Sequence, residues 1–251
     1  MLRLGSPKGR AKALQDAAKA LADAVQRLRF GPPVSHVYNP LDYAWAMHAA
    51  YIEAFAEPRK RVVFLGMNPG PFGMAQTGVP FGDVVTVRDW MHLSAPIGAP
   101  AQQHPKRPVL GLATPRREIS GARLWGAVAA HWRTPAAFFR EHYIANYCPL
   151  LFLEASGRNL TPDKLSVGEK ARLFPACDEH LRAVVRALEP AWVVALGAFA
   201  EHQARAALAG SGVRIGRILH PSPANPEANR DWAGAVRQEL AALGLCRPHA
   251  P

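Results

Sequence analysis

The hydrophobic positions along this chain follow two different patterns. In seven stretches the apolar side chains recur every three or four residues, which places them along one side of a helix. These stretches predict helices over residues 12–30, 40–56, 120–132, 135–143, 166–188, 198–209 and 228–243. Shorter runs, rich in β-branched side chains and apolar at nearly every position, predict buried strands over residues 61–65, 143–152, 192–197 and 213–219.

The order of these elements indicates the fold class. From residue 61 onward strands and helices alternate, which is typical of an α/β domain whose parallel sheet is covered by helices on both faces. No internal repeat or low-complexity linker divides the chain, so we expect residues 1–251 to form one domain. We expect residues 1–9 to be disordered and residues 91–117, which are rich in Pro and Gly, to be irregular.

A long loop follows the predicted strand at residues 61–65. It contains both residue types with special backbone behaviour, namely Gly66, Gly70, Gly73, Gly78, Gly82, Pro69, Pro71 and Pro80. Glycine permits close approach of the backbone, whereas proline removes backbone freedom, so this loop is shaped rather than floppy. Because it leaves the carboxyl end of a strand, where open α/β sheets bind their ligands, we expect it to hold a ligand.

Three polar side chains lie at the tips of predicted strands: Asn68, Asn146 and His220. The carboxyl ends of parallel strands meet at one edge, so we expect these side chains to share a pocket, provided that the strands are parallel. Each also has a structural explanation. Asn before Pro is common in turns, a buried amide can bond a neighbouring backbone group, and His before Pro can cap a loop. Phe81, taken singly, is more typical of a core position than of a stacking platform.

The chain is strongly basic. It has 30 Lys and Arg against 19 Asp and Glu, a formal net charge of +11, and a sequence pI near 10.1. This balance favours a polyanionic partner, either nucleic acid or an acidic membrane surface, although basic composition can also serve solubility alone.

Cysteine content and hydropathy indicate the cellular compartment of the protein. Three widely spaced cysteines form no disulfide framework or iron–sulfur motif, which predicts a reducing compartment. The longest apolar runs are about nine residues, against the roughly 20 that span a bilayer. The first residues lack the apolar segment of a secretory signal. We therefore expect an intracellular protein, cytoplasmic or in the nucleoid in a bacterium and nuclear in a eukaryote.

Four longer motifs carry a resemblance to a known family. GMNPGPFGMAQTGVPFG at residues 66–82, then HPKRPVLGL and SGRNLTP, and finally HPSPANPEAN closely resemble the single-strand-selective monofunctional branch of the uracil-DNA glycosylase superfamily. The similarity runs from about residue 39 to residue 245. It implies a three-layer α/β/α sandwich around a parallel four-stranded sheet. It also implies hydrolysis of the N-glycosyl bond of uracil and 5-substituted uracils such as 5-hydroxymethyluracil, in single- and double-stranded DNA.

The resemblance implies a role for each matching residue. Asn68 places the attacking water, His220 lies near uracil O2, Asn146 reads the pyrimidine edge, and Phe81 stacks on the base. Gly70 leaves room for a 5-substituent. The remaining substrate-binding positions are Gly66, Met67, Phe72 and Met74.

A segment after the last strand is expected to insert into DNA: Pro221, Ser222, Pro223, Ala224, Asn225 and Arg230. Here the chain departs from the family pattern, which commonly has Arg in place of Ala224 and Gly in place of Asp231. The loss of a long cationic wedge predicts weaker flipping from a duplex and a larger share of activity on single strands.

Other functions remain possible at this stage. A DNA-binding member of the same fold with weak catalysis, or one acting on deaminated purines, is the main alternative. A nucleotide-dependent enzyme, a serine hydrolase and a zinc protease are disfavoured because GxxxxGK[ST], GxGxxG, GxSxG and HExxH are absent. The first and last motifs contain no lysine, which favours simple hydrolysis over lyase chemistry. We expect a monomer that needs no cofactor or metal and has no membrane partner.

Overall fold

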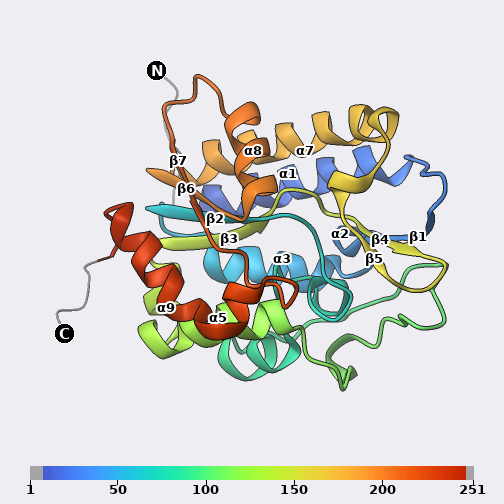
Figure 1. The fold of residues 1–251 in the computed structure, drawn as a ribbon, viewed down its shortest axis with the longest axis horizontal. Coiled ribbons are helices and arrows are strands. Elements are labelled where there is room, and N and C mark those ends of the chain that lie inside the picture. Colours follow the sequence, from blue (N-terminus) through green and yellow to red (C-terminus); the bar gives the residue numbers. More distant parts are fainter. Residues whose placement is uncertain (1–7, 247–251) are drawn as a thin grey trace.

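A four-stranded parallel sheet lies at the centre of the computed structural model, which describes residues 8–246 (Figure 1). Its strand order is β3-β2-β6-β7. The strands are β2 (Val62–Gly66), β3 (His142–Asn146), β6 (Trp192–Leu196) and β7 (Arg214–Ile218). All neighbouring pairs are parallel, which confirms the sheet predicted from the apolar runs.

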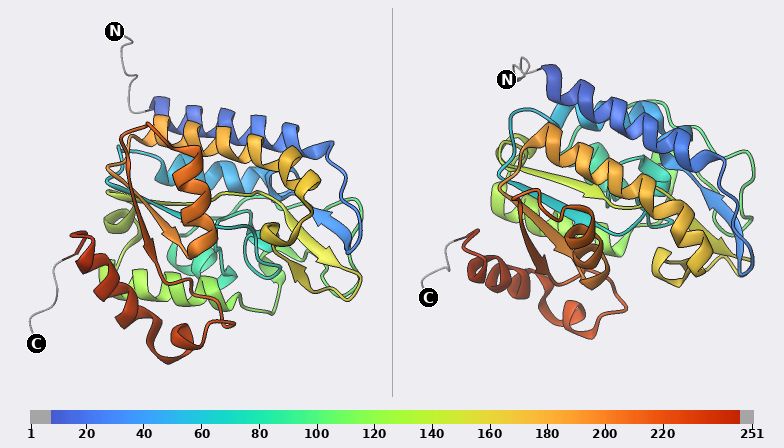
Figure 2. Two further views of the ribbon diagram at one scale, coloured as in Figure 1. Left: turned by 45° about the horizontal axis from the view of Figure 1, so that its top comes forward. Right: turned by 90° about the horizontal axis from the view of Figure 1, so that it is seen from above.

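Helices cover both faces of this sheet, as Figures 1 and 2 show. One layer consists of α1 (Lys8–Gln26), α7 (Val167–Leu188) and α8 (Ala198–Ala207). The other consists of α3 (Trp45–Phe55), α5 (Ile119–Trp132) and α9 (Pro226–Ala242). The three-layer α/β/α sandwich is therefore confirmed. Residues of β2 and β3 are buried at every position, which explains why these strands show no polar alternation.

The predicted strand over residues 143–152 is wrong in its extent. It divides into β3 and β4 (Leu151–Glu154), because the backbone turns at residues 147–150 and Pro149 has no N–H to continue a ladder. β4 pairs antiparallel with β1 (Val34–Tyr38) and with β5 (Asn159–Leu160). This second, three-stranded sheet has strands of two to five residues. β1 is only partly buried, so it lacks the continuous apolar run that marks the strands of the central sheet.

Several helix boundaries also differ from the predictions. α1 begins at Lys8, so residues 8 and 9 are helical rather than disordered, and residues 1–7 lie outside the described residues. The helix predicted over residues 40–56 is broken at Ala44 into α2 (Pro40–Tyr43) and α3. The Tyr43 carbonyl accepts the Gly98 N–H (2.8 Å) instead of continuing the helix. α6 (Pro135–Phe139) is N-capped by Thr134 as predicted but ends early, because His142 already belongs to β3.

Short helical turns complete the chain: α4 (Met74–Thr77), a π-helical turn at Thr86–Trp90, and 3₁₀ turns at Gly111–Ala113 and Pro162–Lys164. Met91 directly follows the π-helical turn. The remaining residues of the segment 91–117 are irregular, as expected, except for the 3₁₀ turn at Gly111–Ala113. No helix within residues 8–246 is long and apolar enough to cross a membrane.

The contact between α5 and the Gly/Pro-rich loop yields a first prediction. A Cβ atom at Gly121 would lie 2.0 Å from the Phe81 carbonyl oxygen, whereas one at Gly126, on the same helix, would meet nothing within 4 Å. We expect Gly121→Ala to destabilise the fold by about 1–3 kcal/mol through steric conflict with the backbone. Gly126→Ala should stabilise it by about 0.5–1 kcal/mol, because alanine is the better helix former. Urea unfolding of both variants measures the difference, and equal stabilities would contradict the close packing of α5 on the loop.

Candidate active site

A pocket of about 340 Å³ opens at the carboxyl edge of the parallel sheet. It is lined by Met67, Asn68, Gly70, Pro71, Met74, Phe81, Glu118, Ser120, Asn159, Thr161, His220, Ser222 and Pro223. The long Gly/Pro-rich loop and the loop after β7, which are far apart in sequence, therefore form one cavity. Eight of the residues predicted for the site lie in its wall.

Gly66, the last residue of β2, permits two of the predicted residues to approach each other. A Cβ atom there would lie 2.4 Å from Asn146 Oδ1 and 2.4 Å from Phe81 Cε2. Asn146 ends β3 directly opposite Gly66 in the sheet register. The edge of the Phe81 ring and the amide of Asn146 therefore occupy the space that a side chain at Gly66 would take. This places these two groups side by side.

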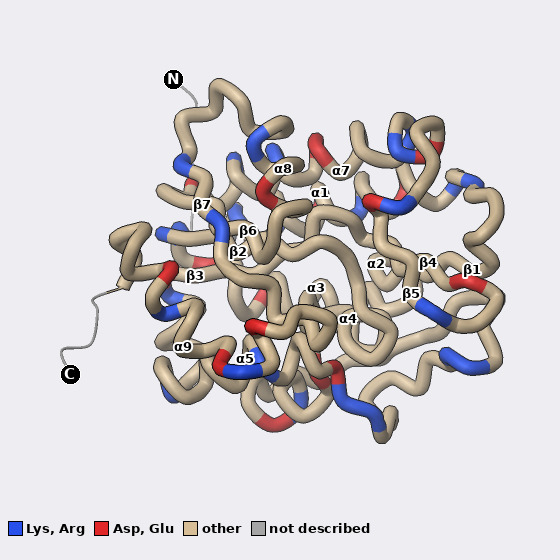
Figure 3. Tube along the Cα trace, viewed as in Figure 1, with Lys and Arg blue, Asp and Glu red and all other residues tan. Residues whose placement is uncertain are grey.

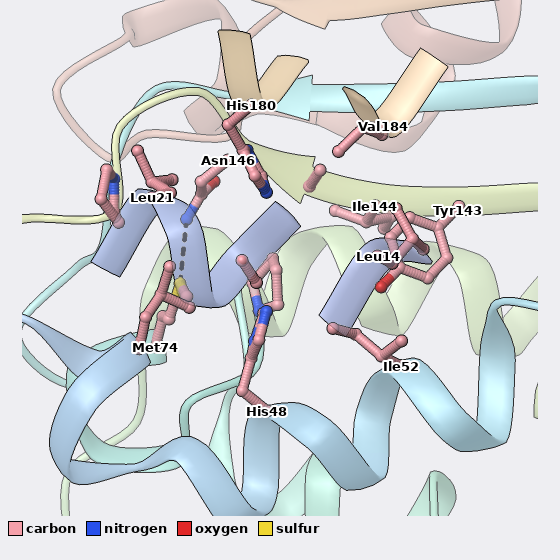
Figure 4. A pocket seen from close by; sticks show the side chains of 15 residues that line it. Leu14, Leu21, His48, Ile52, Met74, Tyr143, Ile144, Asn146, His180 and Val184 are labelled. Carbon is pink, nitrogen blue, oxygen red and sulfur yellow. Dashed lines mark hydrogen bonds between the residues drawn. The ribbon is translucent and has the colours of Figure 1, made fainter. Parts of the chain in front are cut away.

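The Asn146 amide is buried and only half satisfied. Its Nδ2 donates to Met74 Sδ (3.3 Å), a weak acceptor, as Figure 4 shows. Among residues 8–246, its Oδ1 is one of four buried side-chain polar atoms without a hydrogen-bond partner. Asn146 lines a small interior cavity of about 30 Å³, together with His48 and His180, next to the larger pocket; Met74 lines both. A buried amide in this state is suited to accept a ligand group.

His220 reaches the pocket across the tip of β6. That strand is followed by Gly197, whose φ is +90° and whose Cβ would lie 3.2 Å from the His220 Cβ, so glycine is needed for the loop to cross there. The Ser222 N–H donates to His220 Nδ1 (3.1 Å), so the proton of the neutral ring resides on Nε2. Burial lowers the pKa of His220 from 6.5 to about 4, which keeps the imidazole neutral at physiological pH.

Asn68 is held by backbone carbonyls. Its Nδ2 donates to Leu150 O (3.1 Å) and to Pro69 O (3.4 Å). These bonds orient the amide, since both are made by the nitrogen, and leave its carbonyl oxygen as the group that can accept from a bound molecule.

Phe81 occupies an unusual backbone conformation. Its φ is +55°, a region that bulky residues rarely adopt, and its ring centroid lies 6.1 Å from that of His220. The conformation is supported two residues later by Asp83, which is fully buried and accepts from Arg117 Nη2 (2.6 Å). The strained turn places the ring between Gly66 and His220 rather than in the core.

Gly70 borders a carboxyl group rather than open space. A Cβ atom at Gly70 would lie 2.3 Å from Glu118 Oε2, and one at Gly73 would lie 2.9 Å from Glu118 Cγ. Gly70 was expected to leave room beside the base. Glu118 occupies part of that room, on the side to which a side chain at residue 70 would project.

Phe72 does not line the pocket. Its ring lies between two guanidinium groups, with Arg107 Cζ 5.3 Å and Arg116 Cζ 4.9 Å from the ring centroid. Phe72 is half-buried and Arg116 is exposed, so the stack lies at the surface beside the pocket. Such cation–π contacts fix the position of the guanidinium groups.

The segment predicted to insert into DNA is a hydrogen-bonded loop with a small tip. Pro223 and Ala224 are exposed, and Asn225 accepts the Glu227 N–H to cap α9. Arg230 is exposed within α9.

Arg123 on α5 holds this loop in place. It donates to Pro221 O (3.2 Å) and to Asn229 Oδ1 (2.7 Å), and Asn229 in turn donates to Pro223 O (2.9 Å). The loop is therefore anchored to α5 directly at Pro221 and, through Asn229, at Pro223.

Sequence reasoning missed five residues of the pocket wall: Pro71, Glu118, Ser120, Asn159 and Thr161. Two of them, Asn159 and Thr161, belong to the SGRNLTP motif, so that signal was available. Glu118 and Ser120 come from the end of the irregular segment and the start of α5, where no pattern indicated a site. Within the described part of the chain, no group of three or more His, Cys, Asp or Glu side chains is placed to hold a metal ion.

The fold and the pocket define an α/β/α protein with a pocket lined by polar and apolar side chains at the carboxyl edge of its sheet. The model of the uracil DNA glycosylase superfamily matches residues 53–241. The chain belongs to this superfamily.

Curated relatives confirm the resemblance to its single-strand-selective monofunctional branch. The mouse single-strand selective monofunctional uracil DNA glycosylase is 49% identical over 223 residues, which are 88% of this chain and 80% of the relative. The bovine protein of the same name is 46% identical over 242 residues, 96% of this chain and 89% of the relative. The crystal structure of Pedobacter heparinus SMUG2 shares the fold, with a TM-score of 0.63 and 20% identity over 91% of this chain and 97% of that one.

The low pKa of His220 yields a prediction for stability. The unfolded imidazole titrates near 6.5 and the folded one near 4, so the unfolded state binds more protons between these values. The contribution of neutral His220 is complete above pH 6.5 and is lost as the pH falls toward 4. We expect His220→Gln to reduce the pH dependence of the unfolding free energy in this window, by at most about 1.4 kcal/mol per pH unit. Urea titrations at several pH values test this, and an unchanged slope would show that the folded imidazole is not protected from protonation.

Proposed function

We propose that this chain is a monofunctional DNA glycosylase of base-excision repair that hydrolyses the N-glycosyl bond of uracil and of 5-substituted uracils such as 5-hydroxymethyluracil, in single- and double-stranded DNA. Membership of the family and the names of its relatives support the reaction class. The observation that carries the substrate assignment is the unpartnered Asn146 carbonyl beside the Phe81 ring.

Recognition of the base uses these two residues. The ring of Phe81 stacks on a flipped pyrimidine. Asn146 Oδ1 accepts from uracil N3–H, and its Nδ2 exchanges the weak Met74 Sδ contact for O4. Cytosine presents the opposite donor and acceptor pattern at these positions. It would leave buried groups unpaired, at a cost of about 1–3 kcal/mol for each group.

Departure of the base uses His220. As the N-glycosyl bond breaks, its electron pair moves to the base and negative charge develops on O2. The neutral imidazole donates from Nε2 to that oxygen, because Nδ1 is occupied by the Ser222 N–H. This hydrogen bond strengthens as the charge grows, so it stabilises the transition state more than the bound substrate.

Water replaces the base at the sugar. Asn68 is neutral and too weak to act as a general base, but its carbonyl oxygen orients a water molecule toward C1′. The water oxygen forms the new C1′–O bond and releases a proton to the solvent, and the departing base anion takes up a proton from the solvent, which leaves an abasic site and the free base. Within residues 8–246, the pocket wall contains no lysine, so water is the nucleophile that this arrangement favours over an amine.

Access to the base depends on the loop at residues 221–225. Flipping a base out of a duplex costs a few kcal/mol, and a base in a single strand avoids much of this cost. The exposed tip of this loop, Pro223 and Ala224, is small and uncharged, so it fills less of the gap than a long cationic side chain would. This supports a larger share of activity on single strands, with Arg123 holding the loop in register and Arg230 near the DNA.

Backbone phosphates are bound beside the pocket rather than by a general positive surface. Figure 3 shows Lys and Arg spread around the whole outline of the molecule. Arg107 and Arg116, stacked on Phe72, are an ordered pair near the pocket that can hold a phosphate of the strand entering it. That the enzyme acts as a monomer inside the cell stays a prediction.

Base release tests the proposed activity directly. We expect the protein to release uracil from a single-stranded oligonucleotide containing one deoxyuridine, with slower release from the matching duplex. His220→Leu should lower the single-turnover rate about 10²–10³-fold, because it removes the donor to the leaving base. Chromatography of the free base and alkaline cleavage of the abasic product measure both.

The same assay separates catalysis from binding. A protein that binds this oligonucleotide but releases no uracil would be a binding member of the fold, and release of hypoxanthine in preference to uracil would indicate the deaminated-purine alternative. Strand cleavage without alkali would contradict a monofunctional reaction.

The Arg107–Phe72–Arg116 stack predicts the salt dependence of binding. We expect the double variant Arg107→Ala, Arg116→Ala to reduce the slope of log Kd against log salt for single-stranded DNA by about 1.4, because each phosphate that a guanidinium neutralises adds about 0.7 to this slope. Arg140→Ala is the matched control, since this exposed arginine precedes β3 at the opposite edge of the sheet. Fluorescence anisotropy measures the slopes, and equal slopes for all three proteins would exclude phosphate binding at the stack.

A further inference from the structure

One carboxyl group lies in the pocket wall, and neither base recognition nor hydrolysis as proposed uses it. Glu118 is the residue before α5, and its side chain is largely buried against Gly70 and Gly73. It accepts a long hydrogen bond from the Phe72 N–H (3.4 Å). Among residues 8–246 no salt bridge reaches it, because the neighbouring Arg117 is paired with Asp83.

A buried acid without a cation is costly for the fold. Burial raises the pKa of the Glu118 carboxyl, and the Phe72 and Ser120 N–H groups offset this only in part. A methionine or leucine of similar size would avoid the cost. The carboxyl group therefore has a use that an apolar side chain cannot fulfil, and its position in the wall of the pocket points to the ligand.

The contacts proposed above for Asn146 and His220 leave one edge of the pyrimidine facing Glu118. Asn146 contacts N3 and O4, and His220 contacts O2. N1 carries the sugar, so C5 and C6 face the remaining side of the pocket. Gly70, Met74 and Glu118 line the pocket, and the proposed orientation of the base places C5 and C6 toward them. Because Gly70 and Gly73 have no side chains, nothing from these residues separates the carboxyl group from a substituent on C5.

We propose that Glu118 is a specificity-determining residue, whose carboxylate accepts a hydrogen bond from a hydroxyl-bearing substituent at C5 of the base. This inference rests on the proposed function and names the substrates that the same pocket prefers.

The chemistry of the C5 substituent then determines which bases the pocket prefers. A 5-hydroxymethyl or 5-hydroxy group donates to the carboxylate and compensates for its burial. A 5-methyl group, as in thymine, would remove water from the carboxylate and offer nothing in return, so the residue also disfavours the normal base. A 5-formyl group can only accept, and its oxygen would face the carboxylate oxygens unfavourably.

A purely structural role makes a different prediction. If Glu118 only holds the Phe72 backbone, its loss would loosen the Gly/Pro-rich loop and reduce the excision of every base to a similar degree. A specificity role changes the ratio between substrates. Uracil, which has hydrogen at C5, is therefore the internal reference for each variant.

Two variants test the proposal by kcat/KM on single-stranded oligonucleotides carrying uracil, 5-hydroxymethyluracil or 5-formyluracil. Glu118→Met keeps the volume and removes the acceptor. It should lower the ratio of 5-hydroxymethyluracil to uracil about tenfold to a hundredfold. In Glu118→Gln the amide oxygen accepts from Phe72 N–H and the NH₂ faces the pocket. This variant should raise the ratio of 5-formyluracil to uracil, because the amide donates to the formyl oxygen.

Controls keep the outcomes distinct. Glu53→Met, at an exposed position of α3, should leave both ratios at their wild-type values. Thermal unfolding of each variant checks that the fold is retained. If the wild type releases uracil but Glu118→Met lowers all three activities equally, the specificity role is overturned. Absence of uracil release by the wild type would instead overturn the proposed function, and this inference with it.

Discussion

The site depends on the absence of side chains at the tips of two central strands. Gly66 ends β2 and Gly197 follows β6, and a Cβ atom at either position would meet a residue of the pocket: Asn146 and Phe81 at the first, His220 at the second. Because these strands lie next to each other in the middle of the sheet, their glycines open a space that the flanking loops fill. Groups from distant parts of the chain are thereby brought close together at the carboxyl edge of the sheet.

The three groups at this edge of the sheet are neutral. Asn68 and His220 line the pocket, and Asn146 lines the small cavity next to it. The amides carry no charge, and the imidazole is held neutral because its removal from water lowers its pKa. Such groups cannot abstract a proton strongly, but they can be oriented in advance and stabilise charge where it appears, which suits a reaction whose leaving group becomes an anion. The surrounding structure bears the cost, through a strained Phe81 backbone and a buried Asp83 carboxylate that is paired with the exposed Arg117.

In the proposed function, recognition of the base and access to the base are handled by different parts of the molecule. The pocket wall, including Glu118, would sense the edge and the substituents of one ring. The exposed loop tip at Pro223 and Ala224 and the arginines stacked on Phe72 would contact the strand that carries it. Under this proposal, the small side chain at residue 224 changes the preferred form of DNA without changing the chemistry in the pocket.

The sequence alone determined the parallel sheet, its helical layers and the three polar residues at the strand tips, because apolar periodicity and Gly/Pro placement are local properties of the chain. Its motifs identified the family. Only the tertiary structure decided that the apolar run after His142 divides between two sheets, since strand pairing partners lie far away in sequence. Only the tertiary structure placed Phe72 outside the pocket and Glu118 in its wall. The neighbours of a side chain depend on how separate segments pack. The sequence around residue 118 therefore does not indicate that this side chain lies against the glycines at residues 70 and 73.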